Sequence, residues 1–153
     1  MIPAPQEIRT YFVTTVTANR RRVFQVEANA ELLCSTLQGY RRDGRFALHA
    51  FVVMPNHLHL LLTPAADVSL EKAVQFIKGG FSFRFKSKMG VWERSYNEVQ
   101  ILSLEKFEAC RRYIEQNPVR ARLAASPEEF AYSSAGRPGE VDSVPEHFLK
   151  ARG

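Results

Sequence analysis

The sequence is poor in cysteine, the residue that braces many small secreted proteins, with only two in 153 residues. Cys34 and Cys110 stand far apart and lack metal-motif spacing, which argues against a disulfide framework and for a reducing compartment. No apolar run approaches the ~18–20 residues of a membrane span. The opening MIPAPQEIRTYF also lacks the basic start and apolar stretch of a signal peptide. We therefore expect a cytoplasmic protein with no membrane contact.

The chain also lacks a glycine-rich phosphate loop, an internal repeat and a visible linker. Its length is that of one domain, large enough to bury a hydrophobic core. Lys and Arg (21) outnumber Asp and Glu (16), which gives a net charge of +5 and a pI near 9.5. This balance fits a polyanionic partner such as nucleic acid, although many basic proteins bind none.

The first half of the chain alternates between strand-like and helix-like patterns. Residues 10–17 are β-branched and aromatic, which predicts a strand. Residues 26–40 repeat apolar positions at helical spacing, and the pattern stops at Gly44. The stretch FALHAFVVMPNHLHLLLTP then holds two strand-like runs separated by Met54-Pro55-Asn56. A turn at that proline predicts an antiparallel hairpin.

The second half adds two predicted helices and a short strand. One helix begins at residues 69–71 and extends to about residue 89, with Gly79-Gly80 as a point where it bends or breaks. Residues 99–102 suit a short strand, and a further helix starts at residue 103 and must end at Pro118. The order β-α-β-β-α-(β)-α predicts an α+β, ferredoxin-like domain, with helices on an antiparallel sheet. We expect this domain over residues 1–135 and an irregular surface tail over residues 136–153.

Two histidines, His57 and His59, stand two residues apart in the second hairpin strand. Because side chains alternate across a sheet, both rings point to the same face and can converge on one metal ion. The alternative is a pair of hydrogen-bonded sheet histidines. His49, on the other hairpin strand, is either a partner of this site or simply a buried histidine, and His147 belongs to no constellation.

The last predicted helix offers a phenol and an amide, Tyr113 and Asn117, four residues apart at the margin of its apolar stripe. They could supply a reactive group and a third metal ligand. The alternatives are a rim tyrosine and an asparagine that caps a further turn starting at Pro118.

Basic and aromatic residues suited to phosphates and bases occur along much of the chain. The candidates for DNA contacts are Arg20, Arg21, Arg22, Lys78, Arg84, Lys86, Lys88, Trp92, Arg94, Arg112, Arg120 and Arg122.

Three motifs in this order, VVMPNHLHLLL, VWERSYNE and YIEQNPVRARL, resemble those of the REP-associated tyrosine transposases. These form a branch of the single-tyrosine, His-hydrophobic-His transposases of bacterial insertion sequences. The resemblance covers about residues 11–134 and implies a ferredoxin-like domain, a divalent ion (Mg or Mn) and cleavage of single-stranded DNA beside palindromic hairpins.

Matched to these motifs, His57 and His59 are the metal histidines and Tyr113 is the nucleophile that forms a 5′-phosphotyrosine. The third ligand resembles Asn117, whereas relatives from insertion sequences carry glutamine at that place and Gln116 is one position out of step. Those relatives act as dimers, while the REP-associated branch is monomeric. We expect a monomer, with a dimer as the alternative.

Two other functions fit the same residues. The first is a hairpin-binding protein without catalysis, in which Tyr113 is inert. The second is a metal hydrolase in which the imidazoles bind zinc and water attacks.

Overall fold

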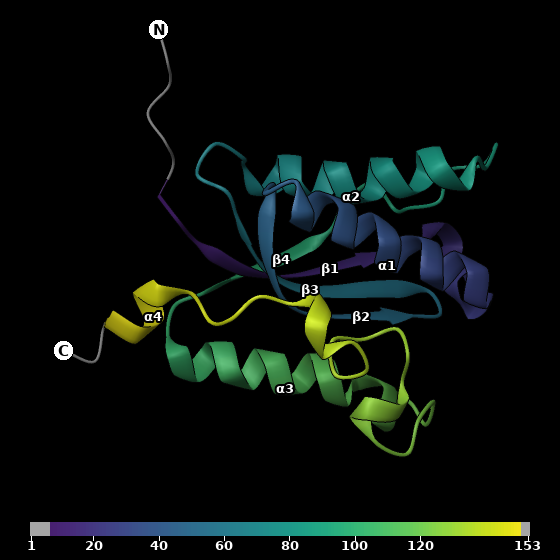
Figure 1. Cartoon of the computed structure of the whole chain (residues 1–153). Coiled ribbons are helices and arrows are strands. Elements are labelled where there is room, and N and C mark those ends of the chain that lie inside the picture. The colour runs from purple at the N-terminus through teal and green to yellow at the C-terminus, as the bar shows by residue number, and fades with distance from the viewer. Residues whose placement is uncertain (1–6, 151–153) are drawn as a thin grey trace, which may run out of the picture.

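The structure is a computed structural model that describes residues 7–150. Its main elements alternate along the chain as the sequence predicts (Figure 1). The strands are β1 (Thr10–Val16), β2 (Phe46–Met54), β3 (His57–Pro64) and β4 (Asn97–Ile101). The α-helices are α1 (Glu27–Arg42), α2 (Leu70–Phe85), α3 (Leu104–Arg120) and α4 (Glu146–Lys150). Four short 3-10 helices also occur, at Ala18–Arg20, Val23–Gln25, Pro127–Glu129 and Pro138–Glu140.

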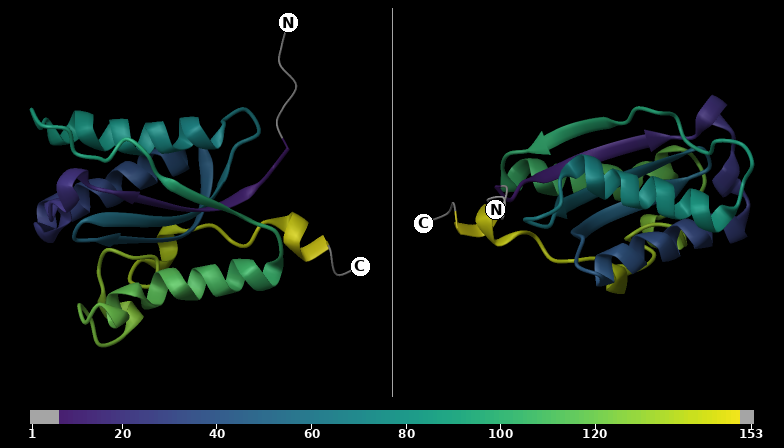
Figure 2. Two further views of the ribbon diagram at one scale, coloured as in Figure 1. Left: turned by 180° about the vertical axis from the view of Figure 1, so that it is seen from behind. Right: turned by 90° about the horizontal axis from the view of Figure 1, so that it is seen from above.

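The four strands form one antiparallel sheet in the order β2-β3-β1-β4. Helices α1 and α2 lie side by side on one face of the sheet, and α3 lies on the other (Figures 1 and 2). This is the ferredoxin-like arrangement of two interleaved β-α-β units. The predicted α+β class and element order are therefore confirmed.

Strand β3 separates the two hydrophobic cores by simple alternation. Leu58, Leu60 and Leu62 are fully buried or nearly so in the core beneath α1 and α2. Leu61 belongs to the second core, beneath α3, and the two histidines of β3 alternate with the leucines of the first core. The predicted placement of both histidines on one face of the sheet is confirmed.

Helix α2 runs without interruption through Gly79-Gly80 and ends at Phe85, four residues before the predicted end. Lys86 terminates it in the left-handed region, with φ of 56°. Gly80 has a packing role, because an added Cβ would lie 2.6 Å from the Tyr40 hydroxyl of α1. The glycine therefore allows the close approach of the two helices.

The prediction that Pro118 ends the last long helix is wrong, since α3 continues through it to Arg120. Proline forfeits its own N–H bond and disturbs the turn before it. Here it stands in the last turn, where little helix remains to be lost. Its own carbonyl accepts from the Leu123 amide at 2.8 Å, so the helix end is closed by backbone bonds beyond the proline.

The C-terminal segment wraps the molecule and contributes to its core. A backbone bond joins the Asp142 amide to the Leu48 carbonyl, and Phe148 of α4 is buried against Phe107 of α3. Residues 151–153 of the predicted tail lie outside the described residues, and the boundary at residue 135 remains a prediction. Within residues 7–150, no helix combines the length and apolar character needed to cross a bilayer.

Candidate active site

The site is built on the face of β3 that α3 covers. His57 and His59 point to this face, with ring centroids 4.8 Å apart. His57 Nδ1 donates to the Asn56 side-chain oxygen at 2.8 Å. His59 Nδ1 is hydrogen-bonded to the Thr14 hydroxyl at 2.8 Å, across the β1–β3 register that pairs these two residues. Neither Nε2 atom has a hydrogen-bond partner within residues 7–150, which leaves both available to a ligand.

Burial favours the neutral form of both imidazoles. It lowers the pKa of His59 to about 3, helped by the nearby positive charge of Arg120 and by His57. Burial also lowers the pKa of His57, and Arg20 acts in the same direction. A neutral imidazole has the lone pair that metal coordination requires, and the Nδ1 hydrogen bonds orient each ring.

Helix α3 brings Tyr113 to the histidines. The fully buried Ile114 faces the sheet, and Tyr113 emerges beside it with 46% of its surface exposed. Its ring centroid lies 5.9 Å from that of His59 and 5.9 Å from that of Phe12 on β1. The phenol is thus reachable from solvent while its ring is held against the histidine strand.

The two candidates for a third ligand differ in exposure. Asn117 is half-buried, one turn after Tyr113, whereas Gln116 is exposed. Within residues 7–150, no group of three His, Cys, Asp or Glu side chains could hold a metal ion. A third protein ligand to the histidine pair would therefore come from another residue type, and an amide oxygen is suited to a divalent ion.

His49 is separate from this pair. It is 4% exposed, and its ring nitrogens are bonded to the Thr63 hydroxyl at 2.8 Å and the Asp142 carbonyl at 3.3 Å. Its ring packs on Phe107. The described contacts of His49 are those of a buried, hydrogen-bonded histidine.

Many of the predicted basic residues gather at the end of the sheet that carries the histidines. The turn after β1 and the C-terminal ends of α2 and α3 all lie at this end (Figures 1 and 2). Arg20 lines a pocket of about 210 Å³ together with Thr14 and Asn97. The predicted DNA-contact residues with exposed side chains at this end include Arg20, Arg22, Lys86, Lys88, Arg112, Arg120 and Arg122.

Other side chains predicted to contact DNA form hydrogen bonds within the protein itself. Arg21 bonds to the backbone carbonyls of Ala18 and Gly90. The Lys78 ammonium donates to the Glu93 carbonyl at 2.6 Å, and Arg94 lies beside it in a pocket of about 410 Å³.

Trp92 and Arg84 are also engaged. Trp92 packs on Phe24 and Phe81 and donates its indole N–H to the Lys78 carbonyl. These contacts leave its ring only partly exposed. Arg84 donates to the Thr36 hydroxyl of α1 at 3.4 Å.

Three residues next to the site were not predicted from the sequence as part of it. Thr14 and Asn56 are hydrogen-bonded to the histidine rings, and Phe12 packs against both His59 and Tyr113. Asn56 adjoins the histidine motif and could have been suspected from that position. Thr14 and Phe12 depend on the register of β1 against β3, which local patterns do not give.

The chain matches a known class of DNA transposase. The family model of IS200-like transposases matches residues 7–117, and the chain belongs to this family. It is similar to the REP-associated tyrosine transposase of Escherichia coli (strain K12), with 25% identity over 86% of this chain and 83% of that protein.

The fold is also that of a solved REP-associated tyrosine transposase bound to a REP hairpin. The TM-score is 0.74, with 23% identity over 93% of this chain and 89% of the other. The resemblance expected from the three sequence motifs is confirmed.

Proposed function

We propose that this protein is a metal-dependent enzyme that nicks and rejoins single-stranded DNA beside palindromic hairpins, with Tyr113 as nucleophile. The observation that carries the proposal is the position of the exposed phenol against His59. The ring centroids of His59 and His57 are in turn 4.8 Å apart. A reactive group and two neutral metal-ligand side chains from distant parts of the chain share one surface.

The covalent step is a transfer of a phosphodiester bond. The Tyr113 oxygen attacks the scissile phosphorus and loses its proton to solvent, forming a 5′-phosphotyrosine. The bond to the 3′ oxygen breaks, and that oxygen takes up a proton to become a free 3′-hydroxyl. Because no water is consumed, the phosphodiester is conserved, and a 3′-hydroxyl from another strand can reverse the step and join the DNA.

The ion that we propose here is Mg or Mn, as the resemblance implies. We assign His57 and His59 as ligands through their Nε2 atoms and Asn117 through its amide oxygen. A free phenol is a poor nucleophile at neutral pH because its pKa lies near ~10. The bound ion would act as a Lewis acid on the scissile phosphate. Thr14 and Asn56 fix the ring orientations, so the protein contributes a preorganised pair of ligands.

The proposed substrate is a hairpin with a single-stranded flank. The net charge of +5 and the exposed arginines and lysines around the histidine pair support a polyanion. A relative of the same fold is bound to a REP hairpin, which supports the hairpin form. Phosphate contacts would supply most of the affinity. Contacts to the bases, and not to the phosphates, would distinguish one DNA sequence from another.

The test is to incubate the protein with an end-labelled hairpin oligonucleotide, with and without Mg or Mn. We expect metal-dependent cleavage and a denaturant-resistant protein–DNA adduct. Hairpin binding with no cleavage would favour the non-catalytic binding protein. Cleavage without an adduct would favour the hydrolase, in which water is the nucleophile.

A further inference from the structure

Tyr113 and Glu115 flank the buried Ile114 on opposite sides of α3, each ~100° around the helix from it. Tyr113 reaches toward β3 and β1, where it meets His59 and Phe12. Glu115 reaches the other way, toward the edge of the sheet formed by β2. A rotation of α3 about its axis that releases Glu115 would therefore also move the phenol.

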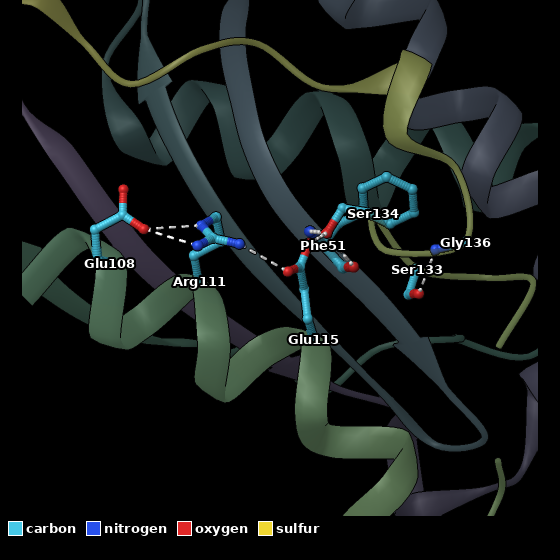
Figure 3. A network of polar contacts seen from close by, with 7 residues as sticks. All are labelled: Phe51, Glu108, Arg111, Glu115, Ser133, Ser134 and Gly136. Carbon is cyan, nitrogen blue, oxygen red and sulfur yellow. Dashed lines mark hydrogen bonds and ion pairs between the residues drawn. The ribbon is translucent and has the colours of Figure 1, made fainter. Parts of the chain in front are cut away.

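The Glu115 carboxylate accepts a hydrogen bond from the Ser134 hydroxyl, and Ser134 is itself bonded to the edge of β2 (Figure 3). The Ser134 amide donates to the Phe51 carbonyl at 2.9 Å, and the Phe51 amide donates to the Ser134 hydroxyl oxygen at 3.1 Å. Ser134 is 2% exposed. Its neighbour Ser133 closes the local turn through its hydroxyl, which accepts from the Gly136 amide.

The turn around Ser134 is tightly constrained. An added Cβ at Gly136 would collide with the Phe130 carbonyl oxygen, so the turn closes in this form only with glycine. The Tyr132 carbonyl also accepts from the Val53 amide at 2.8 Å, next along the edge of β2. Ser134 is thus a fixed point on the sheet rather than part of a loose loop.

The hydroxyl of Ser134 has one proton, and two oxygens lie within reach of it. Glu115 Oε2 is 3.1 Å away, and the Phe51 carbonyl oxygen is 3.3 Å away. The carboxylate is the stronger acceptor because it is charged. Arg111 holds the other carboxylate oxygen of Glu115 at 3.0 Å and also binds Glu108 at 2.8 Å (Figure 3).

We infer that Glu115 is a positioning residue for Tyr113: its carboxylate, held by the Ser134 hydroxyl, fixes the rotation of α3 and thereby the place of the phenol beside His59. The inference rests on the proposed function, because it assigns Tyr113 the attack. Glu115 itself touches neither the histidines nor the phenol in the described contacts, so its effect passes through the helix.

The experiment measures the single-turnover rate of adduct formation at saturating hairpin, with hairpin affinity and the unfolding midpoint recorded for every variant. Glu115→Ala and Ser134→Ala should each slow the adduct step about 10- to 100-fold, the scale of a 1 Å misplacement of a reacting group. Hairpin affinity should stay close to that of the wild type. Glu115→Gln keeps the shape and one acceptor, and it should restore part of the rate.

The matched control is Glu108→Ala, which removes a carboxylate from the same helix and from Arg111 but not the bond to Ser134. It should leave the adduct rate within about twofold of the wild type, well under the ~1.4 kcal/mol that corresponds to tenfold. The double variant Glu115→Ala/Ser134→Ala should be no slower than the slower single variant. The reason is that each single change already removes the same hydrogen bond, the one between Ser134 and Glu115.

Three results would overturn the inference. These are an unchanged rate in Glu115→Ala, an equal loss in Glu108→Ala, or single-variant effects that multiply in the double variant. If Glu115→Ala does not fold, a wild-type rate in Ser134→Ala, which removes the same hydrogen bond from its other side, overturns the inference in its place. A wild-type protein that forms no adduct under any metal condition refutes instead the proposed function.

Discussion

The guanidinium of Arg120 lies over the ring of Tyr113, with its central carbon 4.3 Å from the ring centroid. The same side chain donates to the Tyr113 backbone carbonyl at 2.7 Å, so it folds back along the last two turns of α3. Arg120 also contributes to the lowered pKa of His59. One cation therefore stands beside both the proposed nucleophile and a proposed metal ligand.

Arg120→Ala should slow adduct formation by roughly tenfold or more, since contacts to charged groups are worth about 1.5–3 kcal/mol. The reason is the loss of a positive charge where the phosphate must sit. Single-turnover assays would measure the rate. Arg112→Ala is the matched control, because Arg112 is exposed on the same helix and has no described contact with Tyr113. Equal losses in the two variants would reduce Arg120 to a general phosphate contact.

The metal assignment predicts a separation of binding from chemistry. His57→Ala or His59→Ala should abolish cleavage and adduct formation while hairpin affinity, which depends on phosphate contacts, changes little. Both quantities are measured on one oligonucleotide, and chelation of the metal should reproduce the loss in the wild type. His147→Ala is the control, since His147 is exposed on α4. Normal cleavage by the double alanine variant with Mg or Mn present would show that the site is misplaced.

The charge distribution predicts a steep dependence of binding on salt. Each phosphate contact to single-stranded DNA contributes about 0.7 to the slope of log affinity against log salt. Arg22→Ala and Lys88→Ala, at the histidine end of the molecule, should each make the slope shallower by about this amount. Lys72→Ala, in the first turn of α2 and so at its other end, should not. A wild-type affinity that does not change with salt would contradict a basic DNA-binding surface.

The features of the site that could be predicted from the sequence are those that depend on the local spacing of residues along one strand or one helix. Alternation along β3 places His57 and His59 on one face, and helical spacing places Tyr113 at the edge of a buried stripe. Thr14 escaped prediction because its bond to His59 depends on a register between strands 45 residues apart. The bond between Ser134 and Glu115 likewise joins two elements that no local pattern relates.

Charge composition does not show which basic or aromatic side chains are held by contacts within the protein. Lys78 and Trp92 lie among basic and aromatic residues in the sequence, yet Lys78 binds backbone carbonyls and Trp92 packs on core phenylalanines. The rule that proline ends a helix failed at Pro118, which α3 passes by two residues. Such outcomes depend on tertiary packing, which a residue type alone does not specify.

Buried His49 predicts a loss of stability in mild acid. Burial lowers its pKa, so the unfolded chain takes up a proton at higher pH than the folded chain does. Its contribution to stability is present above the unfolded pKa of ~6.5 and is lost as pH falls below it, by at most ~1.4 kcal/mol per pH unit. Asp142, whose pKa is lowered, acts only in a more acidic window.

Urea unfolding at neutral pH and at about pH 5.5, with a chelator present, measures this effect in the wild type and in His49→Gln. Glutamine cannot gain the proton, so the variant should lose less stability between the two conditions. The contributions of His57 and His59 cancel in the comparison. Equal losses would show that His49 keeps an ordinary pKa in the folded protein.

Tyr113→Phe is the sharpest test of the nucleophile, because the chain has five tyrosines and only one is assigned the attack. The change removes one oxygen and leaves the ring contacts with His59 and Phe12. Folding, metal binding and hairpin affinity should therefore survive, while the covalent adduct disappears. Wild type and variant are incubated with labelled hairpin DNA and metal, and the peptide attached to the DNA is mapped. Tyr96→Phe serves as the control and should form the adduct normally. An adduct that persists in Tyr113→Phe, or that maps to another tyrosine, would show that the attacking group lies elsewhere.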